Sequence, residues 1–247
     1  MKSQFCRGPF QPRRLWASQR HVLRRSFEHI LISLFCLLAV IAVYPACDRP
    51  PRGVIILCAG DSLTDSEYPR HLQRLLAREG RRAKVLNYGR KGHTSGEYLR
   101  FLRQQGASMA GEHPDFILLQ LGTNDVRVDG DQTPTDAFGR NLEAIIGLFR
   151  EFTDRRGERA RVLLATIPPL PEEFSPPFGP DSRDRVAEEI NPLIRKIAAA
   201  ERLPVVDNYS LFLRSPEFLP DVHPTSKGYR LMARNWLEAL HPLLSGY

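Results

Sequence analysis

Residues 54–64 read VIILCAGDSLT, an apolar run followed by a glycine, an aspartate and a serine. Apolar residues without polar alternation predict a strand that is buried on both faces, as in a parallel sheet covered by helices. A glycine and a serine at the end of such a strand are typical of a turn that exposes the hydroxyl of Ser62 at the start of the next helix. The alternative is that Ser62 simply caps that helix.

Four further short apolar runs follow the first, and helical spacing of apolar residues separates them. The runs are residues 83–86, 116–121, 162–167 and 204–206. The segments with helical spacing are 68–79, 137–152, 186–200 and 229–240. This alternation predicts one α/β domain, a doubly wound parallel sheet with helices on both faces.

The composition and the charge distribution exclude several classes of protein. The chain has 247 residues, of which 42% are hydrophobic and 26% charged, so it is neither disordered, collagen-like nor a multi-span membrane protein. Its net charge is +7, but residues 1–47 contain seven Lys and Arg against Glu28 and so account for +6 of it. Residues 48–247 therefore carry only +1, and we expect no nucleic-acid partner.

Residues 1–47 have the layout of an export signal. An arginine-rich stretch precedes residues 30–43, which are apolar apart from one serine, and residues 45–47 are small or turn-forming. The apolar run is shorter than the ~20 residues of a membrane span, although an uncleaved signal anchor is an alternative. We therefore expect an exported protein that is secreted, anchored in the membrane or held in the cell envelope. Cleavage, lipidation at Cys47 and retention of the segment all remain open.

Polar residues also follow the second and third predicted strands. Residues 87–94 read NYGRKGHT, and their glycines allow backbone N–H groups to approach a ligand. Residues 122–125 read GTND, and the amide of Asn124 can donate to a developing oxyanion. A plain turn capped by Thr94 and a plain turn at Asn124 are the structural alternatives.

A late loop carries the fourth polar block. Residues 221–225 read DVHPT and precede the last predicted helix. A histidine with an acid nearby is what a serine nucleophile needs as its base and orienting group, whereas a lone surface histidine is the alternative. The carboxyl ends of parallel strands lie at one edge of the sheet, so we expect the blocks to meet there.

In this order, the blocks resemble the SGNH (GDSL) hydrolase superfamily. The matching stretches are Gly60-Asp61-Ser62-Leu63, Asn87 with Gly92, Gly122-Thr123-Asn124-Asp125, and His223-Pro224. They extend over residues 54–229, and the hydrolase domain is therefore expected to occupy residues 48–247. The resemblance implies a flavodoxin-like three-layer α/β/α sandwich with a five-stranded parallel sheet.

The resemblance also implies the site and its chemistry. Ser62 would be the nucleophile and His223 the general base. The oxyanion hole would consist of the backbone N–H groups of Ser62 and Gly92 and the side-chain amide of Asn124. The family usually hydrolyses esters and requires no metal or organic cofactor.

One position departs from the family pattern. The triad aspartate is expected three residues before the histidine, where this chain has Pro220. Asp221 lies two residues before His223, and residues two apart share a face of an extended segment, which Pro224 favours. We therefore predict that Asp221 contacts Nδ1 of His223. The alternatives are a Ser–His dyad without an acid, and Asp207 as the acid.

Taken together, these patterns predict an exported ester hydrolase that works through an acyl-serine. Small acyl esters, such as O-acetyl groups on an envelope or extracellular glycan, are the favoured substrates, and lipid esters come second. The alternatives are an acyltransferase to glycan hydroxyls and a non-catalytic carbohydrate-binding module. Membrane contact is expected only through the N-terminal segment.

Residues 168–180 contain six prolines and are expected to form either a stiff lid or a rigid surface loop.

Overall fold

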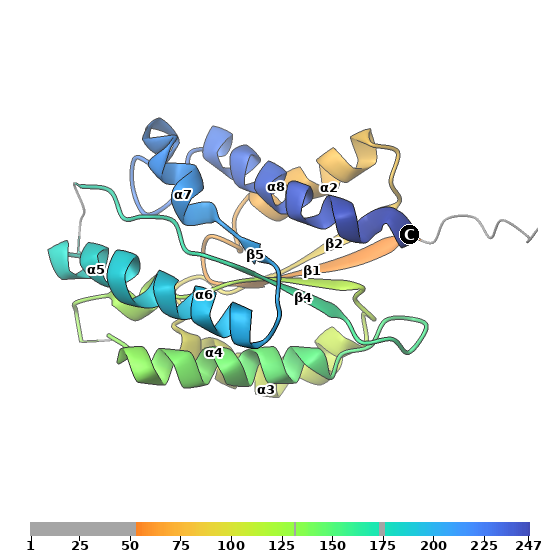
Figure 1. Ribbon diagram of the computed structural model, residues 1–247, viewed down its shortest axis with the longest axis horizontal. Coiled ribbons are helices and arrows are strands. Elements are labelled where there is room, and N and C mark those ends of the chain that lie inside the picture. The colour runs from red at the N-terminus through yellow and green to blue at the C-terminus, as the bar shows by residue number, and fades with distance from the viewer. Residues whose placement is uncertain (1–52, 131, 173–175) are drawn as a thin grey trace, which may run out of the picture. The chain divides into compact units, whose positions relative to one another are not determined.

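The computed structural model describes residues 53–130, 132–172 and 176–247. The predicted export signal, residues 1–47, lies outside the described residues, as does Cys47. Five parallel strands form one sheet in the order β2-β1-β3-β4-β5 (Figure 1). The strands are β1 Val54–Gly60, β2 Ala83–Gly89, β3 Phe116–Gln120, β4 Arg161–Ala165 and β5 Val205–Val206.

Helices cover both faces of this sheet (Figure 1). One face carries α2 (Tyr68–Arg78), α7 (Asn208–Leu213) and α8 (Ser226–Leu240). The other carries α3 (Ser95–Ala110), α4 (Thr135–Arg150), α5 (Pro180–Arg185) and α6 (Asn191–Ala200). Shorter turns are the 3-10 helices Asn124–Val126, Pro216–Phe218 and His241–Gly246 and the π-helical turn Val186–Ile190. The predicted three-layer α/β/α sandwich with a five-stranded parallel sheet is confirmed.

The two-sided burial of β1 explains its unbroken apolar sequence. Leu57 and Ala59 belong to the core on the α3 and α4 face, whereas Ile56 and Cys58 belong to the core on the α2 and α8 face. Since helices exclude water from both faces of the strand, a polar side chain at either set of positions would be buried without water.

None of the helices in the described part of the chain combines the length and apolar character that a membrane crossing requires.

The sequence patterns do not predict α3 and α7, which are additional helices. The buried residues of α3, among them Tyr98, Leu102 and Met109, alternate with glycine, serine and glutamine, so its apolar stripe is weak. Its start is instead stabilised by a capping box, in which Thr94 accepts from the N–H of Glu97 and donates its own N–H to the Glu97 carboxylate. The prediction that Thr94 caps a helix is therefore correct.

The proline-rich segment is anchored in its described parts. Leu170 is buried in the core, and Phe178 packs against that core. The carbonyl of Pro177 accepts a hydrogen bond of 2.8 Å from the N–H of Val128. These contacts favour a rigid surface loop over a lid for residues 168–172 and 176–180.

The strand order places the site. The chain runs from β1 to its neighbour β2 in one direction along the sheet, and from β3 to its neighbour β4 in the opposite direction, so the order reverses between β1 and β3. At such a reversal the loops beyond the carboxyl ends of the strands diverge and leave a crevice, where ligands bind in open α/β sheets. The segments after β1, β2 and β3 are those that carry Ser62, Gly92 and Asn124.

Candidate active site

Ser62 lies in a tight turn directly beyond β1. Gly60 ends the strand with a φ of +152°, and a Cβ at this position would lie 1.9 Å from the carbonyl oxygen of Gln120, so only glycine allows β1 and β3 to approach here. Asp61 Oδ1 accepts a hydrogen bond of 3.0 Å from the N–H of Leu63 and stabilises the turn. The side chain of Ser62 is mostly buried, with the residue 8% exposed.

Ser62 neither caps a helix nor stands at a helix start, so both of those predictions are wrong. Helix α2 begins at Tyr68 with Glu67 as its N-cap. In the segment between Ser62 and α2, the N–H groups of Thr64 and Asp65 donate hydrogen bonds to the carbonyl of Asp61 and so form a separate turn. This turn satisfies the local backbone and leaves the Ser62 hydroxyl free for a side-chain partner.

That partner is His223, whose Nε2 lies 2.9 Å from Ser62 Oγ. The two residues are 161 positions apart in the sequence. The loop that carries His223 is held by Thr225, which donates its N–H to the carbonyl of Phe218 and caps α8 through the N–H of Gly228. At hydrogen-bond distance, His223 can accept the Ser62 proton. Nδ1 must then carry a hydrogen, and the partner of Nδ1 decides how the ring is oriented.

The structure places neither candidate acid on His223. The exposed Asp221 carboxylate accepts a hydrogen bond of 2.7 Å from the N–H of Val222, and no hydrogen bond or ion pair joins it to His223 among the described residues. Asp207 caps α7 and pairs with Arg195 at 2.8 Å. Burial raises the pKa of Asp207, but the bonds from the first turn of α7 and from Arg195 outweigh it and lower that pKa to about 2. The role of Asp221 as orienting acid stays a prediction.

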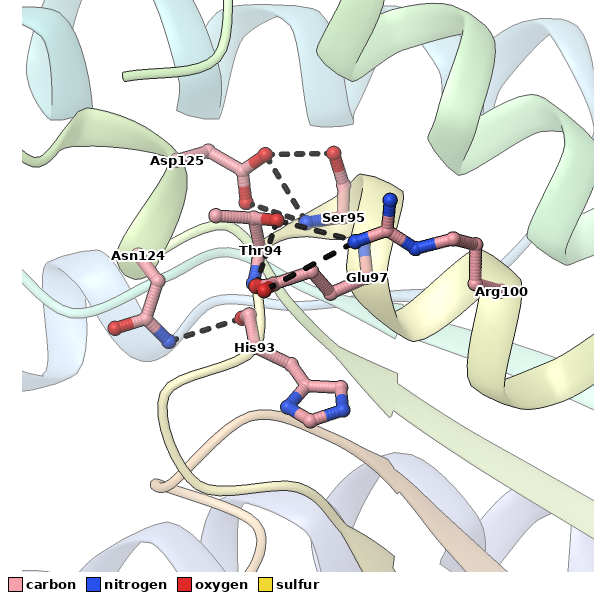
Figure 2. Close-up of polar contacts among 7 residues, drawn as sticks. All are labelled: His93, Thr94, Ser95, Glu97, Arg100, Asn124 and Asp125. Carbon is pink, nitrogen blue, oxygen red and sulfur yellow. Dashed lines mark hydrogen bonds and ion pairs between the residues drawn. The ribbon is translucent and has the colours of Figure 1, made fainter. Parts of the chain in front are cut away.

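Asn124 and the Gly92 loop lie side by side. Nδ2 of Asn124 donates a hydrogen bond of 2.9 Å to the backbone carbonyl of His93 (Figure 2). An amide nitrogen carries two hydrogens, so one remains for a ligand. Gly92, next to His93, has a φ of +78°, which favours glycine. The bond therefore brings two of the predicted oxyanion donors together from the ends of β2 and β3.

Sequence reasoning missed the support for this pair. The buried carboxylate of Asp125 accepts the N–H of Ser95, at 2.9 and 3.1 Å, and its hydroxyl, at 2.6 Å, at the start of α3 (Figure 2). Arg185 donates to the carbonyls of Asp125, at 3.0 Å, and Thr133, at 2.7 Å. Together they fix the segment that carries Asn124. The only sequence signal was the position of Asp125 directly after Asn124.

The described residues contain neither a metal-ligand cluster nor an exposed thiol. No group of three His, Cys, Asp or Glu side chains in these residues is arranged to hold a metal ion. Cys58 is fully buried, and burial raises the pKa of its thiol to about 12, so it is an inert core residue.

Asp61 is the most unusual charged group of the site. It is fully buried beside Ser62, and its Oδ2 has no hydrogen-bond partner among the described residues. Burial, with a smaller contribution from the charge of Asp125, raises the pKa of Asp61 to about 6, although Leu63 and Thr123 act to lower it. The folded protein therefore holds the Asp61 proton more tightly than the unfolded chain does.

We expect Asp61→Asn to change how stability depends on pH. In the wild type, the stabilisation from the Asp61 proton is complete below about pH 4 and is lost as the pH rises through 6, a difference of about 3 kcal/mol. Asparagine keeps the acceptor for Leu63 and carries no charge. The variant should therefore match the wild type near pH 4 and exceed its free energy of unfolding by up to about 3 kcal/mol near pH 7.

Urea unfolding between pH 4 and pH 8 measures this difference. The control is Asp65→Asn, which removes an exposed carboxylate three positions from Ser62. If the free energies of unfolding of wild type and Asp61→Asn changed in parallel with pH, the pKa of Asp61 would not be raised in the folded protein.

Comparisons with known proteins identify a family and a set of similar folds. A family model described as GDSL-like lipase/acylhydrolase family matches residues 58–231, a range that includes Ser62, Gly92, Asn124, Asp221 and His223. A multidomain esterase from Ruminococcus flavefaciens is 32% identical over 137 residues, which are 53% of this chain. The match covers 16% of that relative, so the chain spans only a small part of its length.

Solved structures share the fold at low sequence identity. The lipase/acylhydrolase from Enterococcus faecalis is 24% identical with a TM-score of 0.65, over 78% of this chain and 98% of the other. A carbohydrate acetylesterase family member from Sinorhizobium meliloti is 22% identical with a TM-score of 0.63, over 78% and 100%. An acetyl xylan esterase is 22% identical with a TM-score of 0.62, over 76% and 100%.

Proposed function

Because the chain belongs to the GDSL-like lipase/acylhydrolase family, with residues 58–231 as a carboxylic-ester hydrolase domain, we propose that the protein is an exported serine esterase that removes short acyl groups from glycans. The observation that carries the catalytic part is the distance of 2.9 Å between Ser62 Oγ and His223 Nε2. Export rests on the pattern of residues 1–47 and stays a prediction.

The reaction proceeds through an acyl-serine. His223 Nε2 takes the proton of Ser62 as Oγ attacks the ester carbonyl, and the carbonyl oxygen becomes an oxyanion. The N–H groups of Ser62 and Gly92 and the free amide hydrogen of Asn124 donate to it. The imidazolium returns its proton to the leaving alcohol. Water then attacks the acyl group, with His223 again accepting a proton, and the acid and free Ser62 are released.

Asp221 completes this proposal as the residue that orients His223. Its carboxylate must leave the Val222 N–H and turn toward Nδ1, which is feasible for an exposed side chain. In a dyad, by contrast, water or a backbone carbonyl would hold Nδ1. The two arrangements differ in the effect of removing the carboxylate, and that experiment is described in the Discussion.

The preference for acetyl groups on glycans is supported by what related proteins are named for. A carbohydrate acetylesterase family member and an acetyl xylan esterase share the fold. The expected export would give the protein access to envelope or extracellular glycans. Lipid esters remain the second candidate substrate.

We expect the full chain to hydrolyse p-nitrophenyl acetate with a kcat/KM at least ~10-fold above that for the octanoate, since a short acyl pocket gains little from extra methylenes that it cannot bury. The measurement is initial rate against chain length, with acetylated xylan as the natural-type substrate. A higher kcat/KM for the octanoate would contradict the short-acyl proposal and favour lipid esters. Acyl transfer to an added sugar acceptor in place of acetate release would favour the acyltransferase.

A further inference from the structure

A groove between helices α2 and α8 is lined by cations. It has a volume of about 180 Å³ and is formed by His71, Arg74, Leu75, Arg78, Arg230 and Arg234. A neighbouring hollow of about 300 Å³ shares Arg230 and Arg234 and adds Lys227. The two hollows together are called here the arginine groove. Helices α2 and α8, which carry its basic residues, lie on the opposite face of the sheet from α3 and α4 (Figure 1).

The charges of the arginine groove have few partners within the fold. The side chains of Arg74, Arg78, Arg234 and Lys227 make no hydrogen bond or ion pair with any described residue. Arg230 donates only to the backbone carbonyl of Ser226, at 3.3 Å. Two acids next to the groove already have partners: Glu67 bonds to Ser226 and to His71, which itself lines the groove, and Glu79 pairs with Arg81 and His241.

This concentration of charge is unfavourable for the isolated protein. Arg74 and Arg78 follow each other at helical i,i+4 spacing on α2, as Arg230 and Arg234 do on α8, and like charges at this spacing repel. Residues 48–247 carry a net charge of only +1, so the groove is a local excess rather than a sample of a generally basic surface. An anion in the groove would remove the repulsion.

The type of side chain indicates which anion fits. The planar guanidinium group presents parallel N–H donors that match phosphate oxygens, and arginine is the side chain that favours two-point contacts of this kind. Two adjacent hollows that share Arg230 and Arg234 suit two linked phosphate groups. We propose that the arginine groove is a binding site for the phosphate groups of a phosphate-bearing ligand.

A dissolved ligand fits better than a lipid surface. The arginines line a hollow between two helices, where a single phosphate group can be surrounded. The large apolar side chains that are strongly exposed among the described residues are Val128 and Leu213, and neither lines the groove. The apolar side chains that line the groove, Leu75, Phe218 and Leu231, are only partly exposed, so none of them protrudes as an anchor that would enter a bilayer.

Calorimetric titration of the full chain with inorganic pyrophosphate tests the proposal. We expect saturable binding that weakens when the salt concentration is raised from 50 to 500 mM, by about 10-fold or more. Arg234→Gln should weaken binding at least fivefold, because it removes a donor common to both hollows. Arg103→Gln, which removes an exposed arginine of α3, should leave binding unchanged. The basic residues of 1–47 are present in all three proteins and so do not affect the comparison.

Two results would overturn the proposal. One is an equal effect of Arg234→Gln and Arg103→Gln on pyrophosphate binding. The other is the absence of saturable pyrophosphate binding; if phosphatidylglycerol vesicles then cosediment with the wild type but not with Arg234→Gln, the groove binds a membrane surface instead. Ester hydrolysis is not part of either readout, so the outcome is independent of the proposed enzymatic function.

Discussion

Replacement of Ser62 by alanine is expected to lower kcat for p-nitrophenyl acetate by a factor on the order of 10⁴ or more. The Ser62 hydroxyl is the group within 2.9 Å of His223 Nε2, so its removal eliminates the acyl-serine route. The residual rate acceleration comes from substrate binding and from the oxyanion donors. The measurement is kcat at saturating substrate, with circular dichroism and thermal unfolding to show that the fold is intact.

The matched control for this variant is Ser66→Ala. Ser66 is a half-buried serine of the same β1–α2 connection, and no hydrogen bond joins its hydroxyl to His223. We expect it to retain most of the activity. Without a nucleophile, the residual activity should be far below about 1% of the wild-type kcat. If Ser62→Ala kept more than that, Ser62 would not form the covalent intermediate.

The same assay separates a triad from a dyad. If Asp221 turns to orient His223, Asp221→Asn should lower kcat by at least ~100-fold, because the imidazolium loses the carboxylate that stabilises it. Glu217→Gln removes another exposed acid of the loop before His223 and should have little effect. Equal rates for both variants would exclude Asp221 as the orienting acid and leave a Ser–His dyad or another acid, consistent with the Val222 N–H as the contact of Asp221.

The second largest effect is expected at Asn124. Asn124→Ala should lower kcat by ~100- to 1000-fold with a much smaller change in KM, since the amide donates to charge that exists only in the transition state. Comparing kcat with KM distinguishes this role from simple substrate binding.

A structural explanation for the loss at Asn124 can be tested separately. The variant also loses the bond of Nδ2 to the His93 carbonyl, which contributes about 1 kcal/mol to stability. Asn124→Asp keeps the shape but places negative charge next to the His93 carbonyl and the oxyanion, so it should be at least as inactive. A fall in kcat of less than about fivefold for Asn124→Ala, well below the effect of a lost oxyanion donor, would remove Asn124 from the oxyanion hole.

The helices show where sequence patterns are sufficient. Helix α4, predicted over residues 137–152 and found at Thr135–Arg150, presents a continuous apolar stripe to the core, so its periodicity is visible. Helix α3 has a weak stripe, and besides its local capping box its start is held by bonds from Ser95 to Asp125, 30 residues away. No local window of sequence contains both partners.

The sequence by itself determined the class of fold and the order of the polar blocks along it. Burial on both faces of β1 demands an unbroken apolar run, and the crevice of a doubly wound sheet demands polar residues at strand ends. Both requirements concern residues that are neighbours in the sequence, so the apolar runs and the polar blocks after them are visible as local patterns.

The tertiary structure alone decided which of these side chains meet. The contacts of Ser62 with His223 and of Asn124 with His93 join residues 161 and 31 positions apart. The direction of the Asp221 carboxylate and the meeting of α2 with α8 in the arginine groove are likewise outcomes of packing. Such contacts depend on how loops and helices from distant parts of the chain pack on one sheet. The residues next to a side chain in the sequence therefore do not indicate which distant side chain it contacts.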